Sequence, residues 1–273
     1  MPADATLGRP LPPRPPARTL PPDVAGAHRG PSLVDNATVV RRLDLGPSIT
    51  RLAIRPDGPP QRVEPGQYLS IGLRVDGTFL QRPYSTASPV DAQDDLEFLI
   101  RLVPGGALTP RLWAIGVGDR VHLGRPKGLF TRIPDDRRTH LFIATGTGLA
   151  PFVAMTATML RQPVPPTVVL VHGVSHVAEL AWREEFEAWS GAGAVSYIPA
   201  ISRPDAPANA GWDGRTGRID ALLESLWASH GLDRDRTVAY LCGNPEMITA
   251  ARRILTSLGL PEDAVRSEQY WPA

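Results

Sequence analysis

The chain has 273 residues, of which 42% are hydrophobic, so it is long for one domain and predicts two. Its 29 basic and 28 acidic residues leave a net charge of +1, which favours neither a nucleic acid nor a membrane as partner, and no apolar run suits a membrane span or a secretory signal. The single cysteine, Cys242, excludes a disulfide within the chain and a cysteine-ligated iron–sulfur cluster. We therefore expect a reducing, cytoplasmic location.

Residues 1–35 form a segment of distinct composition, with nine prolines, few aromatic residues and several arginines. Such a segment buries too little apolar surface to order itself, so we expect a disordered tail. The run PPRPP at residues 12–16 leaves open a polyproline ligand for a partner domain. A transit peptide is disfavoured, because prolines break the amphipathic helix that it needs.

Residues 36–135 show short alternating apolar runs, separated by glycine, proline and aspartate. Spacings of about ten residues with turn signals between them predict an antiparallel β-barrel or sandwich. A short helix is expected over 108–115, with Thr109 as its N-cap and a proline in its first turn. The expected strands cover 37–45, 48–56, 67–75, 78–88 and 95–103.

Residues 136–273 change rhythm, because strand-like apolar runs alternate with longer helical ones. This alternation predicts βαβ units, and therefore a doubly wound α/β domain with a parallel sheet that follows the barrel. The expected strands are 141–145, 167–174, 195–202 and 237–243, and the expected helices are 149–162, 177–190, 219–231 and 245–260. Ligands of such a sheet bind at the carboxyl ends of its strands.

The stretch HLFIATGTGLAPF places Gly146 and Gly148 where the first of these strands turns into a helix. Without side chains the backbone can approach a ligand closely, and the helix N-terminus favours an anion such as a pyrophosphate. Pro151 falls in the first turn of the helix, where its missing N–H costs little. A tight turn without a ligand is the alternative.

Three other stretches could serve the same kind of ligand. In QRPYSTASP, Arg82 suits a phosphate, and Tyr84 shares its strand face, while Ser85 points to the other face. In VPGGALT, Thr109 and nearby backbone N–H groups suit phosphate oxygens. In LCGNPEM, Cys242 ends a strand at the expected ligand edge. Taken singly, each stretch has a purely structural alternative: a surface arginine, a capped helix or a buried thiol.

RPYS, VPGGALT, ATGTGLAPF, CGNPEM and a terminal EQYW occur in this order, on a barrel followed by an α/β domain. In this combination the chain resembles the ferredoxin–NADP reductase family, and most of all its bacterial flavodoxin/ferredoxin type. The resemblance covers about residues 37–273. It implies a barrel that binds FAD and an α/β domain that binds NADP(H).

The resemblance also implies roles for residues around FAD. Arg82 would pair with the FAD pyrophosphate, Tyr84 would stack on the flavin, and Ser85 would lie near its N5 atom. Tyr270 would cover the flavin, with Trp271 towards the adenine, and Glu268 would relay protons. The remaining FAD contacts would come from Pro83, Ala107, Leu108, Thr109 and Thr147.

For NADP(H), the resemblance implies that Cys242 borders the nicotinamide, while Gly146 and Gly148 let the nucleotide approach. The 2′-phosphate needs cations, which Arg203, Arg215 and Arg218 offer. The other implied contacts are Val174, Ser175, Ser202, Asn244, Pro245 and Glu246. Many relatives carry an arginine where this chain has Ser175, so one phosphate contact of the family is missing here.

The implied activity is transfer of hydride from NADPH to flavin N5, followed by single-electron transfer to a ferredoxin or flavodoxin. Because this chain has one cysteine, an iron–sulfur centre would lie in a separate partner. A monomer without nucleic acid or membrane partners is expected. The alternatives are a reductase serving an oxygenase, a P450 or free flavin, and a non-catalytic regulator that binds flavin or a nucleotide.

Overall fold

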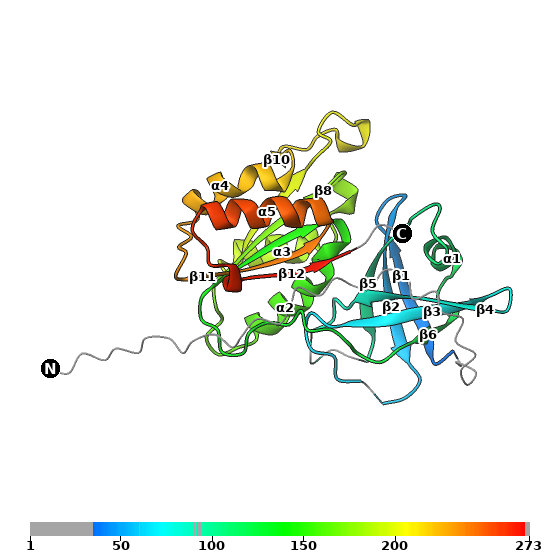
Figure 1. The fold of residues 1–273 in the computed structure, drawn as a ribbon. Helices are drawn as coiled ribbons and strands as arrows, with labels where there is room; N and C mark the ends of the chain where they lie inside the picture. Colours follow the sequence, from blue (N-terminus) through cyan, green and yellow to red (C-terminus); the bar gives the residue numbers. More distant parts are fainter. Residues whose placement is uncertain (1–34, 60, 90, 92–93, 271–273) are drawn as a thin grey trace.

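The computed structural model describes residues 35–59, 61–89, 91 and 94–270. It consists of two lobes, an antiparallel barrel and an α/β sandwich, that lie side by side (Figure 1). This is the architecture that the sequence predicts. The expected N-terminal tail lies outside the described residues, apart from Asp35.

The barrel is a six-stranded sheet in the order β4-β3-β6-β1-β2-β5, with every pairing antiparallel. A bridge between Thr86 and Phe98 joins the end of β4 to β5 and brings the sheet edges together. One helix, α1 (Thr109–Ala114), follows β5. The strands are β1 (Ala37–Asp44), β2 (Ile49–Pro56), β3 (Tyr68–Val75), β4 (Thr78–Ser85), β5 (Leu96–Arg101) and β6 (Arg120–Leu123).

The second sheet has the order β10-β9-β8-β7-β11-β12, and all its pairings are parallel. The long α-helices connect its strands, so the predicted βαβ alternation is confirmed. Its strands are β7 (Thr139–Thr145), β8 (Val168–Val174), β9 (Ser196–Ile201), β10 (Arg215–Thr216), β11 (Thr237–Gly243) and β12 (Val265–Gln269). Its helices are α2 (Ala150–Leu160), α3 (Arg183–Gly191), α4 (Ile219–Ser229) and α5 (Pro245–Ser257), with 3₁₀ turns η1 (Gly146–Leu149), η2 (Val177–Glu179), η3 (Pro207–Asn209) and η4 (Glu262–Ala264).

The central strands β7, β8 and β11 are almost wholly buried, as expected for a parallel sheet covered on both faces. On one face α4 and α5 contribute Leu223 and Ile248 to an apolar cluster with the strands. On the other face α2 and α3 contribute Phe152 and Phe186.

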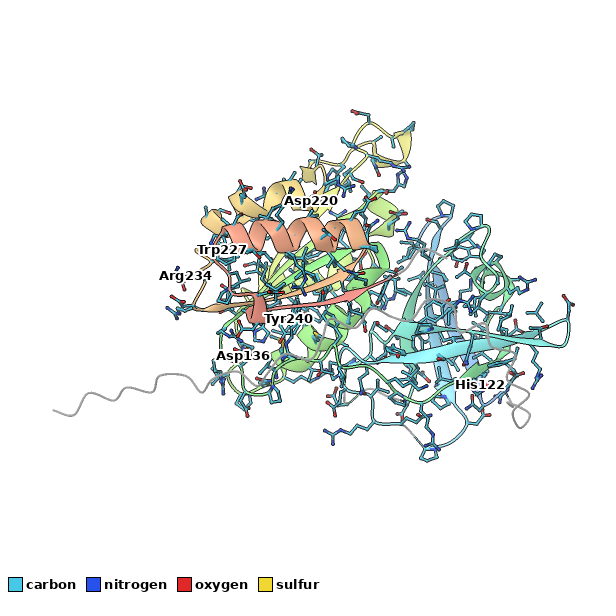
Figure 2. All side chains as sticks on the ribbon, in the orientation of Figure 1. His122, Asp136, Asp220, Trp227, Arg234 and Tyr240 are labelled. Atoms are coloured by element: carbon cyan, nitrogen blue, oxygen red, sulfur yellow. The ribbon has the colours of Figure 1, made fainter. Side chains whose placement is uncertain are left out.

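The second of these clusters continues into the barrel, because it includes Ile49, Leu99 and Phe130. A polar contact adds to it, since the Tyr240 hydroxyl on β11 (Figure 2) accepts a hydrogen bond from the Ile133 N–H at 3.1 Å. The two lobes therefore share an apolar core where they meet, and this fixes how the ends of their strands face one another.

Two local predictions are corrected. The N-cap of α1 is Leu108 and not Thr109, because the Thr109 hydroxyl bonds back to Val103 instead of capping the helix. The helix expected over 177–190 is divided into η2 and α3, because Trp182 adopts a left-handed backbone with φ of 52°. Arg51 of the barrel lies over the Trp182 ring at 3.9 Å and stabilises this break. Among the described residues, no helix has the length and apolarity needed to cross a bilayer.

Candidate active site

The end of β4 directs two neighbouring side chains to opposite faces, as strand geometry requires. Tyr84 packs against the barrel core, and burial raises its phenol pKa. Ser85 is buried on the other side, where its hydroxyl donates a hydrogen bond to Glu268 Oε2 at 3.1 Å. The Tyr270 hydroxyl in turn donates to Ser85 Oγ at 2.9 Å.

The α/β domain supplies three of the residues at this junction. Cys242 on β11 and Glu268 on β12 are directly paired in the parallel sheet. The chain then continues to Tyr270, whose N–H donates to the Gly243 carbonyl at 3.0 Å and whose ring packs against the apolar cluster that contains Cys242. The structure therefore brings together the predicted catalytic residues and one predicted FAD contact: Ser85, Cys242, Glu268 and Tyr270.

Burial determines the protonation of this group. It raises the pKa of the Cys242 thiol well above its usual value, and the nearby Glu268 charge adds to the shift. The thiol is therefore neutral at physiological pH. Burial also raises the pKa of Glu268 to about 7, against the opposing effect of the Ser85 hydrogen bond. Glu268 can thus take up and release a proton near neutral pH.

The predicted glycine turn lies beside this group, between β7 and α2. Gly146 has a φ of 53°, which favours glycine, and its carbonyl lies 3.3 Å from His172 Nε2. A Cβ on Gly148 would lie 2.3 Å from the carbonyl oxygen of Cys242. Between them, Thr147 is half-buried. The turn is thus packed directly onto the carboxyl end of β11.

The segment Asn244–Glu246 begins α5 at the same edge of the sheet. The Asn244 N–H donates to Thr145 Oγ1 at 2.9 Å, and its side chain caps the helix by accepting from the Glu246 N–H at 2.7 Å. Pro245 occupies the first turn. The Asn244 side chain therefore caps α5 in the structure, a role that differs from the cofactor contact predicted for it.

The predicted FAD-phosphate residues lie on β4 and at the start of α1. The half-buried Arg82 donates to the Gln81 carbonyl at 2.8 Å, and Pro83 follows it opposite Ser70 of β3. Both hydrogen-bonding functions of the Thr109 hydroxyl are used by Val103, at 3.0 and 3.1 Å. The backbone N–H groups of residues 107–109 precede the first hydrogen bonds of α1, so they are potential donors to a phosphate.

The predicted 2′-phosphate residues gather at the carboxyl edge of β8, β9 and β10. Ser202, exposed after β9, donates its N–H to the Val174 carbonyl at 2.9 Å, and the exposed Arg203 follows it. Arg215 lies on β10 and pairs with Ala200 of β9.

Arg218 is the N-cap residue of α4 at this same edge. Its guanidinium lies 3.2 Å from Asp220 (Figure 2) and 4.0 Å from Glu246. Two carboxylates therefore share the charge of Arg218, and its role at the 2′-phosphate stays a prediction.

Several buried polar residues in this region were not predicted. His172 contacts the Gly146 carbonyl, and burial lowers its pKa to about 4. Glu179 and Asn209 are buried beside Ser175. They lie in segments whose sequence is typical of a helix or a polar loop, so no sequence pattern indicates their burial. Trp271 lies outside the described residues, and among the residues described no cluster of side chains suits a metal ion.

Comparison with known proteins matches this geometry. Residues 36–131 match the family model of the oxidoreductase FAD-binding domain, and residues 142–253 match that of the oxidoreductase NAD-binding domain. The ferredoxin–NADP reductase of Pseudomonas aeruginosa is 34% identical, over 74% of this chain and 81% of that protein. The reductase component of phenol 2-monooxygenase from a Pseudomonas species is 33% identical, over 85% of this chain and 64% of that protein.

Among solved structures, the ferredoxin–NADP reductase of Neisseria gonorrhoeae with bound FAD and NADP is similar, with a TM-score of 0.73 and 25% identity over 86% of this chain and 98% of that one. The expected FAD and NADP(H) cofactors and the expected oxidoreductase activity are thus supported by both domains. The chain belongs to the ferredoxin–NADP reductase family of FAD- and NAD(P)-dependent oxidoreductases.

Proposed function

We propose that this protein moves electrons between NADPH and a small one-electron carrier, a ferredoxin or a flavodoxin. The observation that carries the proposal is the buried hydrogen-bonded group at the lobe junction, in which Ser85 of the barrel meets Glu268 and Tyr270 of the α/β domain. Because one domain binds FAD and the other binds the nicotinamide nucleotide, a group shared by both supports the proposal that the two cofactors meet there.

The residues present fit both cofactors. Arg82, two positions from the half-buried Tyr84, suits the FAD pyrophosphate beside an aromatic ring. The approach of Gly148 to Cys242 leaves a bare backbone at the carboxyl edge, which suits a nicotinamide nucleotide. On these grounds we assign FAD to the barrel, over residues 36–135, and NADPH to residues 136–273.

When bound, the flavin supplies the step between two-electron hydride chemistry and single-electron transfer. The chain's own residues position the cofactors, exclude water and hold a proton. The neutral, fully buried Cys242 thiol adds no charge and excludes water from the nicotinamide side. Glu268 holds a proton near neutral pH, and Ser85 connects it to the barrel. The Tyr270 ring covers the same position and has to move for nicotinamide to enter.

The preference for NADPH rests on the edge formed by Ser202, Arg203 and Arg215. All three are exposed and lie after or on adjacent strands, so they can converge on a 2′-phosphate dianion. Arg218 contributes less than its position suggests, because Asp220 and Glu246 offset its charge.

The carrier is assigned from the relatives, which include ferredoxin–NADP reductases and oxygenase reductase components. A second candidate is a reductase component that serves an oxygenase through a separate carrier, favoured by the 33% identity to the phenol 2-monooxygenase component. We propose a monomer in the cytoplasm for either case.

The test is an absorbance spectrum of the purified protein, followed by anaerobic addition of NADPH and then of carrier. The expected result is a yellow protein whose flavin bleaches with NADPH and recovers when ferredoxin or flavodoxin is added. A colourless protein that takes up no FAD would contradict the proposal. A bound flavin that NADPH does not bleach, together with no reduction of ferricyanide by NADPH, would indicate a regulator. Release of reduced flavin would indicate a free-flavin reductase.

A further inference from the structure

Glu179 is a buried carboxylate outside the group described above, and its side chain is only 4% exposed. It ends the turn η2, directly after β8. An ionised carboxylate at such a site must be partnered, because removing it from water costs several kcal/mol. Its partners come from both domains. A residue that only stabilised its own turn would not need a partner from the barrel.

One oxygen of this carboxylate holds a backbone turn of the α/β domain. Glu179 Oε2 accepts hydrogen bonds from the N–H groups of Ser175 and His176, at 2.9 and 3.2 Å. These N–H groups lie just beyond the carboxyl end of β8, at the edge proposed for the nucleotide. Glu179 thereby determines the conformation of the turn that Ser175 begins.

The other oxygen faces the barrel. Glu179 Oε1 accepts a hydrogen bond from the Ser48 hydroxyl at 3.2 Å and lies 3.8 Å from the Arg101 guanidinium. Ser48 lies in the β1–β2 connection, and Arg101 ends β5. In the same connection, a Cβ on Gly46 would lie 3.5 Å from the Ala178 Cβ, so the two segments are in close contact.

The buried Asn209 holds the same turn from the other side. Its Oδ1 accepts from the Val177 N–H at 2.8 Å, and its Nδ2 donates to the carbonyls of Ser175 and Arg203, at 3.1 and 2.6 Å. Arg203 is a residue proposed for the 2′-phosphate. A continuous chain of polar contacts therefore runs from Ser48 in the barrel to the main chain of Arg203.

We propose that Glu179 is a positioning residue that ties the nucleotide-binding turn 175–177 to the FAD-binding domain, so that nucleotide affinity in one domain depends on a contact made by the other. The inference rests on the proposed function in one respect, the placement of the nucleotide at this edge. The tie between the domains rests on the contacts alone. Because coupling between sites is reciprocal, FAD-side changes at Ser48 must reach the nucleotide side.

The experiment compares three variants of the FAD-loaded full chain. Glu179→Gln keeps the size of the side chain but removes its charge. Ser48→Ala removes the hydrogen bond from the barrel to Oε1 and leaves both hydrogen bonds from the turn to Oε2 in place. Glu185→Gln is the matched control, because Glu185 also faces the barrel, 3.5 Å from Arg51, and forms no hydrogen bond with the turn in the described part of the chain.

Two quantities are measured: the affinity for 2′,5′-ADP by titration calorimetry, and amide hydrogen exchange at residues 45–50 and 174–178. We expect Glu179→Gln to weaken 2′,5′-ADP by about tenfold and Ser48→Ala by about two- to threefold, as loss of charged hydrogen bonds predicts. Each of these two variants should speed amide hydrogen exchange at residues 45–50 and at residues 174–178. Glu185→Gln should leave the affinity and the exchange at 174–178 unchanged.

The proposal is overturned if Ser48→Ala changes neither affinity nor exchange at 174–178, because Glu179 would then brace only its own turn. It is also overturned if Glu185→Gln has the same effect as Ser48→Ala. Should Glu179→Gln fail to fold, Ser48→Ala still decides the matter. Failure of the unaltered protein to bind 2′,5′-ADP would contradict the proposed nucleotide site, while the exchange data would still decide whether the domains are tied.

Discussion

The Tyr270 hydroxyl and the Ser85 hydroxyl, which lie 185 positions apart in the chain, are joined by a hydrogen bond of 2.9 Å between the two lobes. Ser85 donates its own hydroxyl hydrogen to Glu268, so this one hydroxyl connects the Tyr270 ring to the buried Glu268 carboxyl group. Removing that hydroxyl disconnects both residues at once.

Ser85→Ala is accordingly expected to slow anaerobic flavin reduction by NADPH by roughly 10- to 100-fold, the range for loss of a hydrogen bond to a charged group. Stopped-flow absorbance measures this rate. Ser88→Ala is the control, because the Ser88 hydroxyl bonds to the main chain of Asp95 and Glu97 within the barrel. Equal slowing by both variants would show that the effect is a general loss of barrel stability.

The raised pKa of Glu268 predicts a pH dependence of stability in the cofactor-free protein. Its pKa is about 7 in the folded chain, above the ordinary glutamate value of 4.5 expected of an unfolded chain, so the folded state binds the proton more tightly. This contribution is fully present below about pH 4.5 and is lost as pH rises through about 7. At about 1.4 kcal/mol per pKa unit, it amounts to roughly 3 kcal/mol.

His140 and His172 act in the opposite direction, because burial lowers the pKa of each to about 4. Their contribution is lost as pH falls from about 6.5 towards 4. The Glu268 contribution is therefore isolated as the difference between the unaltered protein and Glu268→Gln, measured by urea unfolding from pH 5 to 8. A difference that does not change with pH would mean that Glu268 titrates normally.

Gly148→Ala is expected to weaken NADP⁺ binding by more than about tenfold and to destabilise the fold by about 1–3 kcal/mol, as overpacking does. The added methyl would lie 2.3 Å from the Cys242 carbonyl oxygen, so β11 or the turn must move. Calorimetry and thermal unfolding measure the two effects. Gly191→Ala is the control and should change neither NADP⁺ affinity nor stability. Apart from its chain neighbours and the backbone of its own helix, no described atom would lie within 4 Å of the added methyl.

Arg218→Ala and Asp220→Asn are expected to change NADPH affinity in opposite directions. Loss of the arginine should weaken NADPH by about threefold or more without changing NADH, whereas loss of the carboxylate frees the cation and should strengthen NADPH. Flavin difference spectra with each nucleotide measure the four affinities. If Arg218→Ala weakens NADH as much as NADPH, Arg218 has no part in recognising the 2′-phosphate.

Most of the fold follows from local patterns. The short apolar runs of β2 and β5 between turn signals, and the continuous apolar runs of β7, β8 and β11, identify these strands and both sheet types. The opposite orientations of Tyr84 and Ser85 follow from the same two-residue period of a strand. The predicted domain boundary near residue 135 stays a prediction.

Features decided by tertiary contacts were not predictable. The two-residue β10 has no pattern of its own and exists because it pairs with β9. Trp182 is left-handed because it packs under Arg51, against its intrinsic preference. Glu179 lies in a segment that resembles a helix, and only the folded chain shows that its carboxylate is buried between two domains.

The order of strands in the parallel sheet has a consequence for folding kinetics. Of the two neighbours of β7 in the sheet, β8 lies about 30 residues further along the chain and β11 about 100 residues. Closing that longer loop is slow relative to local helix formation. During refolding, helical circular dichroism should therefore recover before flavin uptake, because Cys242 and the strand beside it reach their positions only when β11 inserts.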